Sequence, residues 1–384
     1  MTENAPLVIV GTGLAGYNLA KEFRKLDSAR PLLLVSADDG RFYSKPLLST
    51  GFAKGKEADE LAMQDAAAMA AQLDAKVLTG TSVSAIDPAA RTLTLDGREQ
   101  PYSDLVLALG AEVRSLPWRE QLGERLLSIN DLADYGRFRA ALVGRKKVLI
   151  IGAGLIGCEF ANDLSLGGFE VTVVATDPWL MPQLLPEPVA AAVQRRLEAL
   201  GVTFHLGCGI RELAASDDGL LALLDDGTEV RADQGLSAIG LAPRTDLAAA
   251  AGLPVGRGVL VDAQLCTSDP HIYALGDCAE VAGLNLMYVM PLMTSARALA
   301  KTLSGAPATV GYPAMPIMVK TPACPLVVAP PLNAAAGDWQ ISGEGEDLRA
   351  VFIDPQGQLQ GFALSGAAVS EKALLTRELP AWLS

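Results

Sequence analysis

Two glycine-rich segments carry the residue types best suited to binding a nucleotide. The spacing Gly-x-Gly-x-x-Gly occurs twice, in Gly11-Thr12-Gly13-Leu14-Ala15-Gly16 and in Gly152-Ala153-Gly154-Leu155-Ile156-Gly157. In such a loop the first glycine makes a tight turn, the second lets the backbone approach a pyrophosphate, and the third lets a helix pack closely on a strand. The N-terminus of that helix then holds the anion. The segments predict two dinucleotide sites, and the alternative for each is an ordinary strand-to-helix turn.

Other reactive side chains are sparse. The cysteines are Cys158, Cys208, Cys266, Cys278 and Cys324. They show no Cys-x-x-Cys or Cys-x4-Cys spacing, which argues against a disulfide framework or a zinc knuckle. His205 and His271 lie far apart in strand-like surroundings, where a packed histidine is favoured over a metal ligand. We expect no metal site.

Lys320 stands out because it interrupts an apolar run, Ile317-Met318-Val319. A charge in apolar surroundings needs a partner. Lys320 is therefore a candidate for placing a positive charge in a binding site. The alternative is a lysine at a strand end that reaches solvent.

The elements around the glycine loops strengthen the nucleotide interpretation. Apolar, strand-like runs at residues 7–10 and 148–151 precede the two loops, and helix-like runs at 17–26 and 158–166 follow them. Residues 31–36 and 170–175 are suitable as the next parallel strands. The whole strand, loop and helix arrangement therefore occurs twice, which chance does not readily supply. An α/β fold with two Rossmann-like dinucleotide-binding domains is expected.

An acidic residue at the end of the second strand of each unit should bind a ribose. The candidates are Asp38 and Asp177, and both lie about two residues beyond the usual place. After residue 175 no Arg or Lys occurs before Arg195, so nothing obvious would neutralise a 2'-phosphate. This favours NADH over NADPH as the second nucleotide.

Composition limits the remaining functions. The chain has 384 residues and a formal net charge of -13, which argues against a general nucleic-acid surface. No apolar stretch reaches the roughly 18–20 residues needed to cross a bilayer. Residues 1–6 show no basic start and no signal-like apolar core. We expect a cytoplasmic enzyme with no membrane span and no nucleic-acid partner.

A later segment, residues 267–279, resembles the second FAD motif of the pyridine nucleotide-disulfide reductase superfamily. Two connecting motifs also match: residues 105–110 resemble the apolar run that ends in Thr-Gly, with Leu109 in place of Thr, and 240–244 resemble the Gly-Arg-x-Pro crossover. The resemblance implies that Asp277 binds the ribityl or phosphate region of FAD. It also implies a discontinuous FAD domain at 1–110 and 244–322, with an NAD domain inserted at 111–243.

Superfamily members that reduce disulfides or oxidise NADH need cysteine after the first unit, whereas this chain has Arg41-Phe42-Tyr43-Ser44-Lys45-Pro46-Leu47-Leu48-Ser49 there. Without a thiol relay, electrons must leave directly from the flavin. The segment resembles reductases that serve small iron proteins, namely ferredoxin, putidaredoxin and rubredoxin reductases. Residues 289–293 and 319–325 resemble the rubredoxin reductase family in particular.

That resemblance implies FAD as cofactor, NADH as reductant and rubredoxin as a one-electron acceptor, in alkane hydroxylation or oxidative-stress electron chains. Two alternatives remain: a ferredoxin reductase component of an oxygenase system, and a flavin-binding redox sensor.

The resemblance further assigns roles to single residues. Lys320, Lys45 and Glu159 are expected beside the reacting rings. For Lys45 the alternative is a solvated side chain, and for Glu159 a glutamate that complements the helix dipole. Pro291 is expected to open a helix that points at the flavin. Further cofactor contacts are expected from Pro46, Val83, Gly240 and Met290.

The C-terminal stretch, 323–384, alternates strand-like runs at 326–329, 339–342, 348–353 and 359–364 with turns, and ends in a helix-like run at 371–379. It predicts a small α+β domain, shorter than the usual dimerisation domain of disulfide reductases, so a monomer is expected. Residues 41–56 contain Arg41, Lys45, Lys54 and Lys56 and no acid. We hypothesise a docking patch for an acidic rubredoxin there, against the alternative of an ordinary solvated loop.

Overall fold

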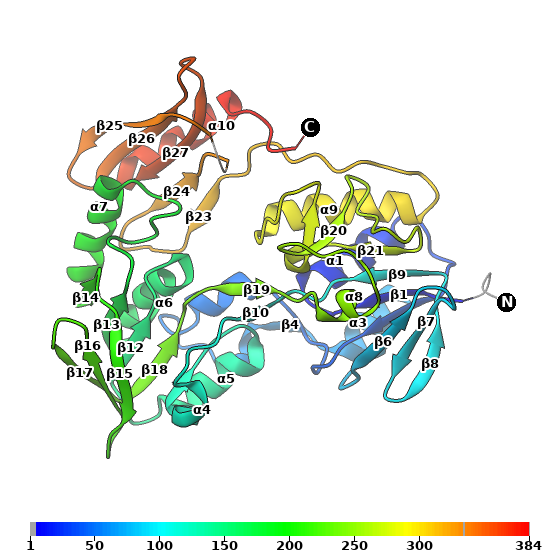
Figure 1. Cartoon of the computed structure of the whole chain (residues 1–384), viewed down its shortest axis with the longest axis horizontal. Coiled ribbons are helices and arrows are strands. Elements are labelled where there is room, and N and C mark those ends of the chain that lie inside the picture. The colour runs from blue at the N-terminus through cyan, green and yellow to red at the C-terminus, as the bar shows by residue number, and fades with distance from the viewer. Residues whose placement is uncertain (1–4, 333–334, 384) are drawn as a thin grey trace.

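Two five-stranded parallel sheets and one five-stranded antiparallel sheet form the main body of the chain, together with smaller two- and three-stranded sheets (Figure 1). The structure is a computed structural model that describes residues 5–332 and 335–383. Its mixed α/β architecture confirms the expected fold class, two Rossmann-like units with a small C-terminal domain.

The first parallel sheet has the strand order β21-β9-β1-β2-β5. These strands are β1 (Leu7–Val10), β2 (Leu32–Val35), β5 (Lys76–Leu78), β9 (Asp104–Leu107) and β21 (Ile272–Ala274). β1 and β2 are buried along their whole length, as is typical of a parallel sheet covered on both faces. Helices α1 (Leu14–Arg24) and α9 (Val289–Leu303) pack against each other above this sheet in Figure 1. Because β21 lies far downstream, the sheet joins two distant segments of the chain.

The second parallel sheet has the order β11-β18-β12-β13-β14. These strands are β11 (Leu126–Leu127), β12 (Lys147–Ile151), β13 (Glu170–Ala175), β14 (Thr203–Leu206) and β18 (Gln234–Ser237). Its helices are α5 (Leu132–Ala141), α6 (Leu155–Leu166) and α7 (Glu187–Glu198). The predicted second strands of the two units are thus β2 and β13.

Two short strands connect the parallel units. β10 (Ala111–Val113) leaves the first unit and β19 (Leu241–Pro243) returns to it, and they pair antiparallel with Ala111 opposite Pro243. These strands lie where the expected insertion at 111–243 begins and ends.

The C-terminal antiparallel sheet has the order β23-β24-β27-β26-β25. Its elements are β23 (Ile317–Val319), β24 (Leu326–Ala329), β25 (Asp338–Glu344), β26 (Asp347–Ile353), β27 (Leu359–Ser365) and the helix α10 (Lys372–Glu378). The last four strands and α10 lie where the sequence predicts them. β23, in contrast, lies before the expected boundary at 322 and is nevertheless hydrogen-bonded to β24. A long segment without helix or strand carries the chain from α9 to β23 (Figure 1).

The remaining elements are short. The helices are α2 (Ala58–Leu61), α3 (Ala66–Leu73), α4 (Arg119–Leu122), α8 (Asp246–Ala250), η1 (Lys45–Thr50), η2 (Gly123–Arg125), η3 (Gly276–Cys278) and η4 (Gly366–Glu371). The strands are β3 (Phe42–Tyr43), β4 (Ala62–Gln64), β6 (Val83–Asp87), β7 (Thr92–Leu95), β8 (Arg98–Pro101), β15 (Ile210–Ala215), β16 (Leu220–Leu224), β17 (Glu229–Ala232), β20 (Val259–Val261) and β22 (Ala279–Val281).

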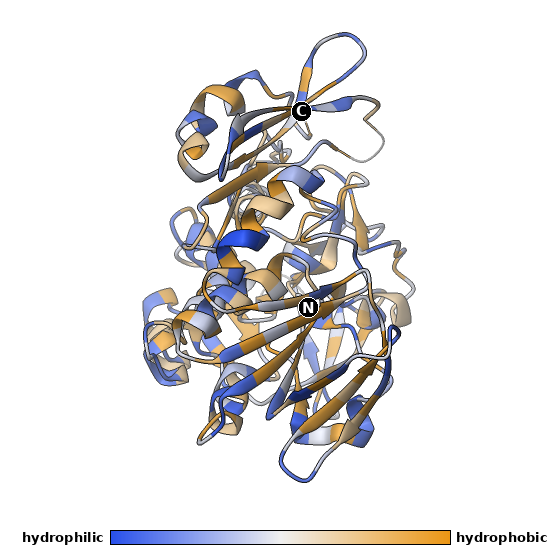
Figure 2. Cartoon of the chain, turned by 90° about the vertical axis from the view of Figure 1, so that its left-hand side faces the viewer, coloured by the Kyte–Doolittle hydropathy of each residue, from blue (hydrophilic) through white to orange (hydrophobic). Residues whose placement is uncertain are grey.

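Apolar residues concentrate on the sheet strands, and Figure 2 shows them orange along the strands near the N-terminus. One apolar cluster fills the first unit. A second cluster is shared by the second unit, the C-terminal sheet and the segment around Leu48 and Phe52. Within the described ranges, no helix is long and apolar enough to cross a membrane.

Candidate active site between the two nucleotide units

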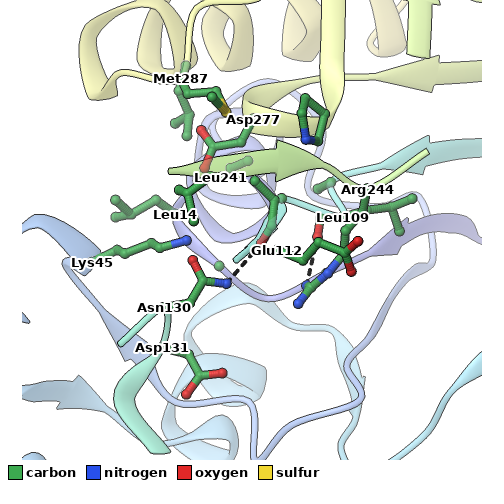
Figure 3. A pocket seen from close by; sticks show the side chains of 18 of the residues that line it. Leu14, Lys45, Leu109, Glu112, Asn130, Asp131, Leu241, Arg244, Asp277 and Met287 are labelled. Carbon is green, nitrogen blue, oxygen red and sulfur yellow. Dashed lines mark hydrogen bonds between the residues drawn. The ribbon is translucent and has the colours of Figure 1, made fainter. Parts of the chain in front are cut away.

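A cavity of about 980 Å³ lies between the two parallel units. This volume is at the upper end of the range typical for cofactor sites. The sequence-predicted residues that line it are Gly11, Thr12, Gly13, Leu14, Ala15, Asp38, Lys45, Pro46, Val83, Leu155, Ile156, Glu159, Asp277, Met290 and Lys320. Residues from distant parts of the sequence therefore meet around one space (Figure 3).

The first glycine loop has a different steric demand at each glycine. A Cβ on Gly11, at φ +116°, would lie 2.2 Å from the Ala108 carbonyl oxygen, and one on Gly16 would lie 1.9 Å from the Gly11 carbonyl oxygen. A Cβ on Gly13 would meet nothing within 4 Å. Gly11 and Gly16 are therefore required for packing, and Gly16 does not line the cavity. Gly13, the residue before α1, leaves open space at the helix N-terminus for an anion.

The second glycine loop repeats this geometry. A Cβ on Gly152, at φ +111°, would lie 2.6 Å from the Ala238 carbonyl oxygen, and one on Gly157 would lie 2.1 Å from the Gly152 carbonyl oxygen. Gly154 again faces open space at the start of α6. These three glycines lie beside the cavity rather than in its wall, whereas Leu155 and Ile156 line it. Both loops thus have the form that a pyrophosphate requires.

Asp38 lies just beyond β2, at the cavity wall. Its Oδ1 accepts a hydrogen bond from the Gly40 amide (2.9 Å) and another from the Ser36 hydroxyl. The Ser36 hydroxyl in turn accepts from the Thr12 hydroxyl (2.6 Å). This chain of hydrogen bonds joins the first glycine loop to the end of β2 and places Asp38 where a ribose ligand is expected.

Besides Gly16 and the glycines of the second loop, three more predicted residues lie outside the cavity lining. Asp177 is half-buried, two residues beyond β13, and its carbonyl oxygen accepts from the Gly207 amide (2.8 Å). Gly240 is exposed between β18 and β19. Pro291 is buried as the third residue of α9, which begins at Val289 rather than at the proline. The helix nevertheless begins at the cavity, because Tyr288, Val289 and Met290 line it.

Lys45 and Asp277 are two charged residues of the cavity wall. Burial lowers the pKa of the Lys45 amine, and the nearby Asp277 carboxylate opposes that shift. Burial likewise raises the pKa of Asp277, and Lys45 opposes it. In Figure 3 the Lys45 amine and the Asn130 amide point into the same part of the cavity, below Asp277. Lys45 is therefore not a solvated surface lysine.

Lys320 and Glu159 form an ion pair that also lines the cavity. The Lys320 amine lies 2.5 Å from Glu159 Oε2, which also accepts from the Ser49 hydroxyl (2.7 Å). Glu159 Oε1 accepts from the backbone amide of Lys320 (3.0 Å). Only 1% of Glu159 is exposed. Because its oxygens are hydrogen-bonded to side chains and to backbone far outside its own helix, Glu159 does more than complement the helix dipole.

Sequence reasoning missed several lining residues. They are Glu112, Asn130, Asp131, Arg244, Met287 and Tyr288. Asp131 caps α5 by accepting a hydrogen bond from the Asp134 amide (2.8 Å). An acidic residue at this place in the sequence indicates the start of a helix, but it does not indicate a binding site. Asn130 donates to the Ala111 carbonyl (2.9 Å), and its buried Oδ1 has no hydrogen-bond partner among the described residues.

The residues of this cavity fit a bound flavin dinucleotide, FAD. An orphaned Asn130 Oδ1, a desolvated Asp277–Lys45 pair and open space above Gly13 all leave polar groups or room for a ligand. None of the five cysteines lines the cavity, and all five are unpaired. In the part of the chain that the structure describes, no His, Cys, Asp and Glu cluster could hold a metal ion.

Several known proteins match the chain over nearly its whole length. Residues 5–300 match the family described as pyridine nucleotide-disulphide oxidoreductase, and residues 309–379 match the rubredoxin binding C-terminal domain. A rubredoxin-NAD(+) reductase from Alcanivorax borkumensis is 52% identical over 377 residues, covering 98% of this chain and 99% of the relative. One from Acinetobacter baylyi is 44% identical, covering 98% of each.

Solved structures agree with this match. The covalent putidaredoxin reductase–putidaredoxin complex aligns with a TM-score of 0.89 at 26% identity, covering 99% of this chain and 94% of that chain. A NADH:rubredoxin oxidoreductase from Clostridium acetobutylicum shares the fold, with a TM-score of 0.81 at 19% identity, covering 97% and 94%. As its motifs predict, the chain belongs to the pyridine nucleotide-disulphide oxidoreductase family.

Proposed function

We infer that the chain is a FAD-dependent NADH:rubredoxin reductase. The observation that carries this conclusion is the position of β23. This strand and the residue after it, Lys320, lie within the residues matched as rubredoxin binding, and Ile317, Met318 and Lys320 also line the cavity. The nucleotide cavity and the acceptor-binding module therefore share one wall.

FAD, when bound, accepts a hydride from NADH and releases the electrons singly to an iron carrier. We propose that the first glycine loop and the N-terminus of α1 hold its pyrophosphate, with Asp38 at the ribose and Asp277 at the ribityl region. No acidic residue lies in the first turn of α1, so nothing there repels the anion.

Lys45 and Lys320 both supply positive charge to the cavity. A fixed positive charge in a desolvated site stabilises negative charge that develops on a ligand. Glu159 keeps Lys320 in place through the ion pair and through the Lys320 backbone amide. We propose that these three residues stand beside the reacting rings. Pro46, Val83 and Met290, which line the cavity, are proposed to contact the ligand, and Gly240 and Pro291, which lie outside the lining, to support it indirectly.

The second glycine loop is the proposed NADH site. α6 begins there, and Leu155, Ile156 and Glu159 bring this helix into the cavity wall. Asp177 is the acidic residue nearest the end of β13, where a 2'-phosphate would have to bind. We therefore propose a preference for NADH over NADPH.

Two further properties belong to this proposal. Five unpaired cysteines suit a reducing compartment, which supports a cytoplasmic location. The C-terminal domain at 323–384 is short for a dimerisation domain, which supports a monomer, and sedimentation of the holoenzyme can test this.

The function is tested by mixing the purified holoenzyme with NADH and then with a carrier. We expect rapid bleaching of the bound flavin by NADH, followed by turnover with rubredoxin and not with ferredoxin. Turnover with ferredoxin alone would make the chain a ferredoxin reductase, a class whose solved relative from Rhodopseudomonas palustris aligns with a TM-score of 0.87 at 28% identity. Slow or absent bleaching would remove both enzyme assignments and leave the redox sensor.

A further inference from the structure

Helix α6 carries three buried polar side chains on one face. Glu159, Asn162 and Asp163 are 1%, 1% and 2% exposed. Residues three and four apart lie side by side on a helix surface, so the three form a continuous polar row. A buried polar group is destabilising unless it is hydrogen-bonded, and a buried charge more so. The row therefore needs partners from outside the helix.

Each member of the row binds a segment far away in the sequence. Glu159 binds Ser49 and Lys320, as described above. The two carboxylate oxygens of Asp163 accept from the backbone amides of Phe52 (2.9 Å) and Ala53 (3.0 Å). Asn162 Oδ1 accepts from the backbone amide of Ala323 (3.2 Å). Two outside segments, 49–53 and 320–323, are thus fastened to one helix face.

These two segments carry the cavity lysines. Lys45 begins the helical turn η1 that leads directly into 49–53, and Lys320 begins the second segment. The helix that fastens them also begins at the second glycine loop. α6 thus touches the nicotinamide nucleotide loop, the Lys45 segment and the Lys320 segment.

Neither Asn162 nor Asp163 lines the cavity, so neither touches the reacting groups. We propose that Asn162 and Asp163 are positioning residues that hold the Lys320 and Lys45 segments in register with the NADH-binding helix. This inference rests on the proposed function, because it assigns the two lysines to the flavin.

The test replaces each residue with one of similar size. Asp163→Asn turns an NH₂ group toward one of the two amides, so that one hydrogen bond is lost. Asn162→Leu removes the partner of the Ala323 amide. We expect faster amide hydrogen exchange at 51–53 in the first variant and at 320–323 in the second. NADH should reduce the bound flavin roughly ten- to a hundred-fold more slowly in both, because small displacements of aligned groups have effects of this size. The flavin absorption bands should shift.

Gln234→Leu is the matched control. Gln234 is 0% exposed in the same unit, and its Nε2 donates to the Glu124 carbonyl (2.8 Å), away from both segments. This variant should lose stability while keeping wild-type exchange at 51–53 and 320–323 and a wild-type reduction rate. If Asp163→Asn does not fold, Asn162→Leu decides alone.

Two outcomes would overturn the proposal: wild-type exchange and reduction rate in the folded variants, or the same changes in Gln234→Leu. If NADH fails to bleach the wild-type flavin, the proposed function is wrong, whereas the exchange comparison still shows whether the row fastens the two segments.

Discussion

Asp277 and Lys45 face a cavity in which both of their charges are disfavoured. Burial raises the pKa of the Asp277 carboxyl and lowers that of the Lys45 amine, and each partly offsets the shift of the other. Such opposed shifts in a cavity are typical of binding and catalytic sites. Without a ligand, this pair should destabilise the fold at neutral pH.

Replacement of Asp277 by Asn should make the stability of the FAD-free protein less dependent on pH. The native Asp277 carboxyl holds its proton more tightly than the unfolded one, so the native state binds more protons and stability falls as pH rises. This loss begins near the ordinary pKa of 3.8 and is complete above the raised pKa of the folded carboxyl. Asp277→Asn removes this contribution, so its free energy of unfolding should change less over this pH range. Urea unfolding of both proteins between about pH 4 and pH 7 measures it. Parallel curves would contradict the burial of Asp277.

Sequence motifs identify single residues only where the motif includes them. Asp277 lies in a Gly-Asp motif that can be found without a structure, and Lys320 interrupts an apolar run. Asn130 has no such signal, because its place in the cavity wall depends on β10, where the Ala111 carbonyl accepts its hydrogen bond. The sequence also identified Glu159 as a site residue. Its hydrogen bonds to Ser49 and the Lys320 amide, however, depend on contacts between distant elements.

The two strand, loop and helix units give the most direct test of which nucleotide binds where. Gly13 lines the cavity, and Gly13→Ala places a methyl group in open space there, so the fold should lose only about 1 kcal/mol. The holoenzyme should lose FAD, because the methyl group occupies the path of the pyrophosphate. Gly154→Ala should keep FAD and raise the KM for NADH about ten-fold or more. FAD content by absorbance and steady-state kinetics measure both effects.

Gly16→Ala is the control for packing. Its Cβ would lie 1.9 Å from the Gly11 carbonyl oxygen, so this variant should be poorly folded whatever ligand is present. Loss of FAD in Gly154→Ala, with FAD retained in Gly13→Ala, would reverse the assignment of the loops.

The spacing of apolar residues and the turn residues predicted those helices and strands that depend mainly on local sequence. The run at 170–175 is β13 and the run at 326–329 is β24, residue for residue. The sheet to which β23 belongs was less predictable. β23 lies before the boundary that the sequence predicted for the C-terminal domain, but it is hydrogen-bonded to β24 of that domain. Strand pairing depends on tertiary contacts, which no local sequence pattern contains.

Charge on the whole molecule does not say where an acidic carrier docks. Among the basic residues of 41–56, Arg41 is paired with Asp39 (2.7 Å) and Asp59 (2.6 Å), and Lys45 lies in the cavity. Only Lys54 and Lys56 remain as candidates for the hypothesised patch. A second candidate lies on the rubredoxin-binding module, where Met318 is 65% exposed at the cavity.

Lys372 joins Met318 on that module, with its amine 3.8 Å from the Met318 sulfur. An exposed apolar side chain beside a positive charge suits a partner with an apolar contact surface inside an acidic rim. We therefore expect Lys372→Glu to lower kcat/KM for rubredoxin roughly ten-fold at low salt, and less at high salt, because exposed charges are screened. Ferricyanide reduction should stay at the wild-type rate.

The double variant Lys54→Glu, Lys56→Glu makes a larger change in net charge at the other candidate surface, so it separates local docking from overall repulsion. If general charge governed the encounter, this variant would slow rubredoxin reduction more than Lys372→Glu does. If docking is confined to the module at 309–379, the single change at Lys372 should have the larger effect. A strong loss in the double variant together with a wild-type rate in Lys372→Glu would place the carrier on residues 41–56 instead.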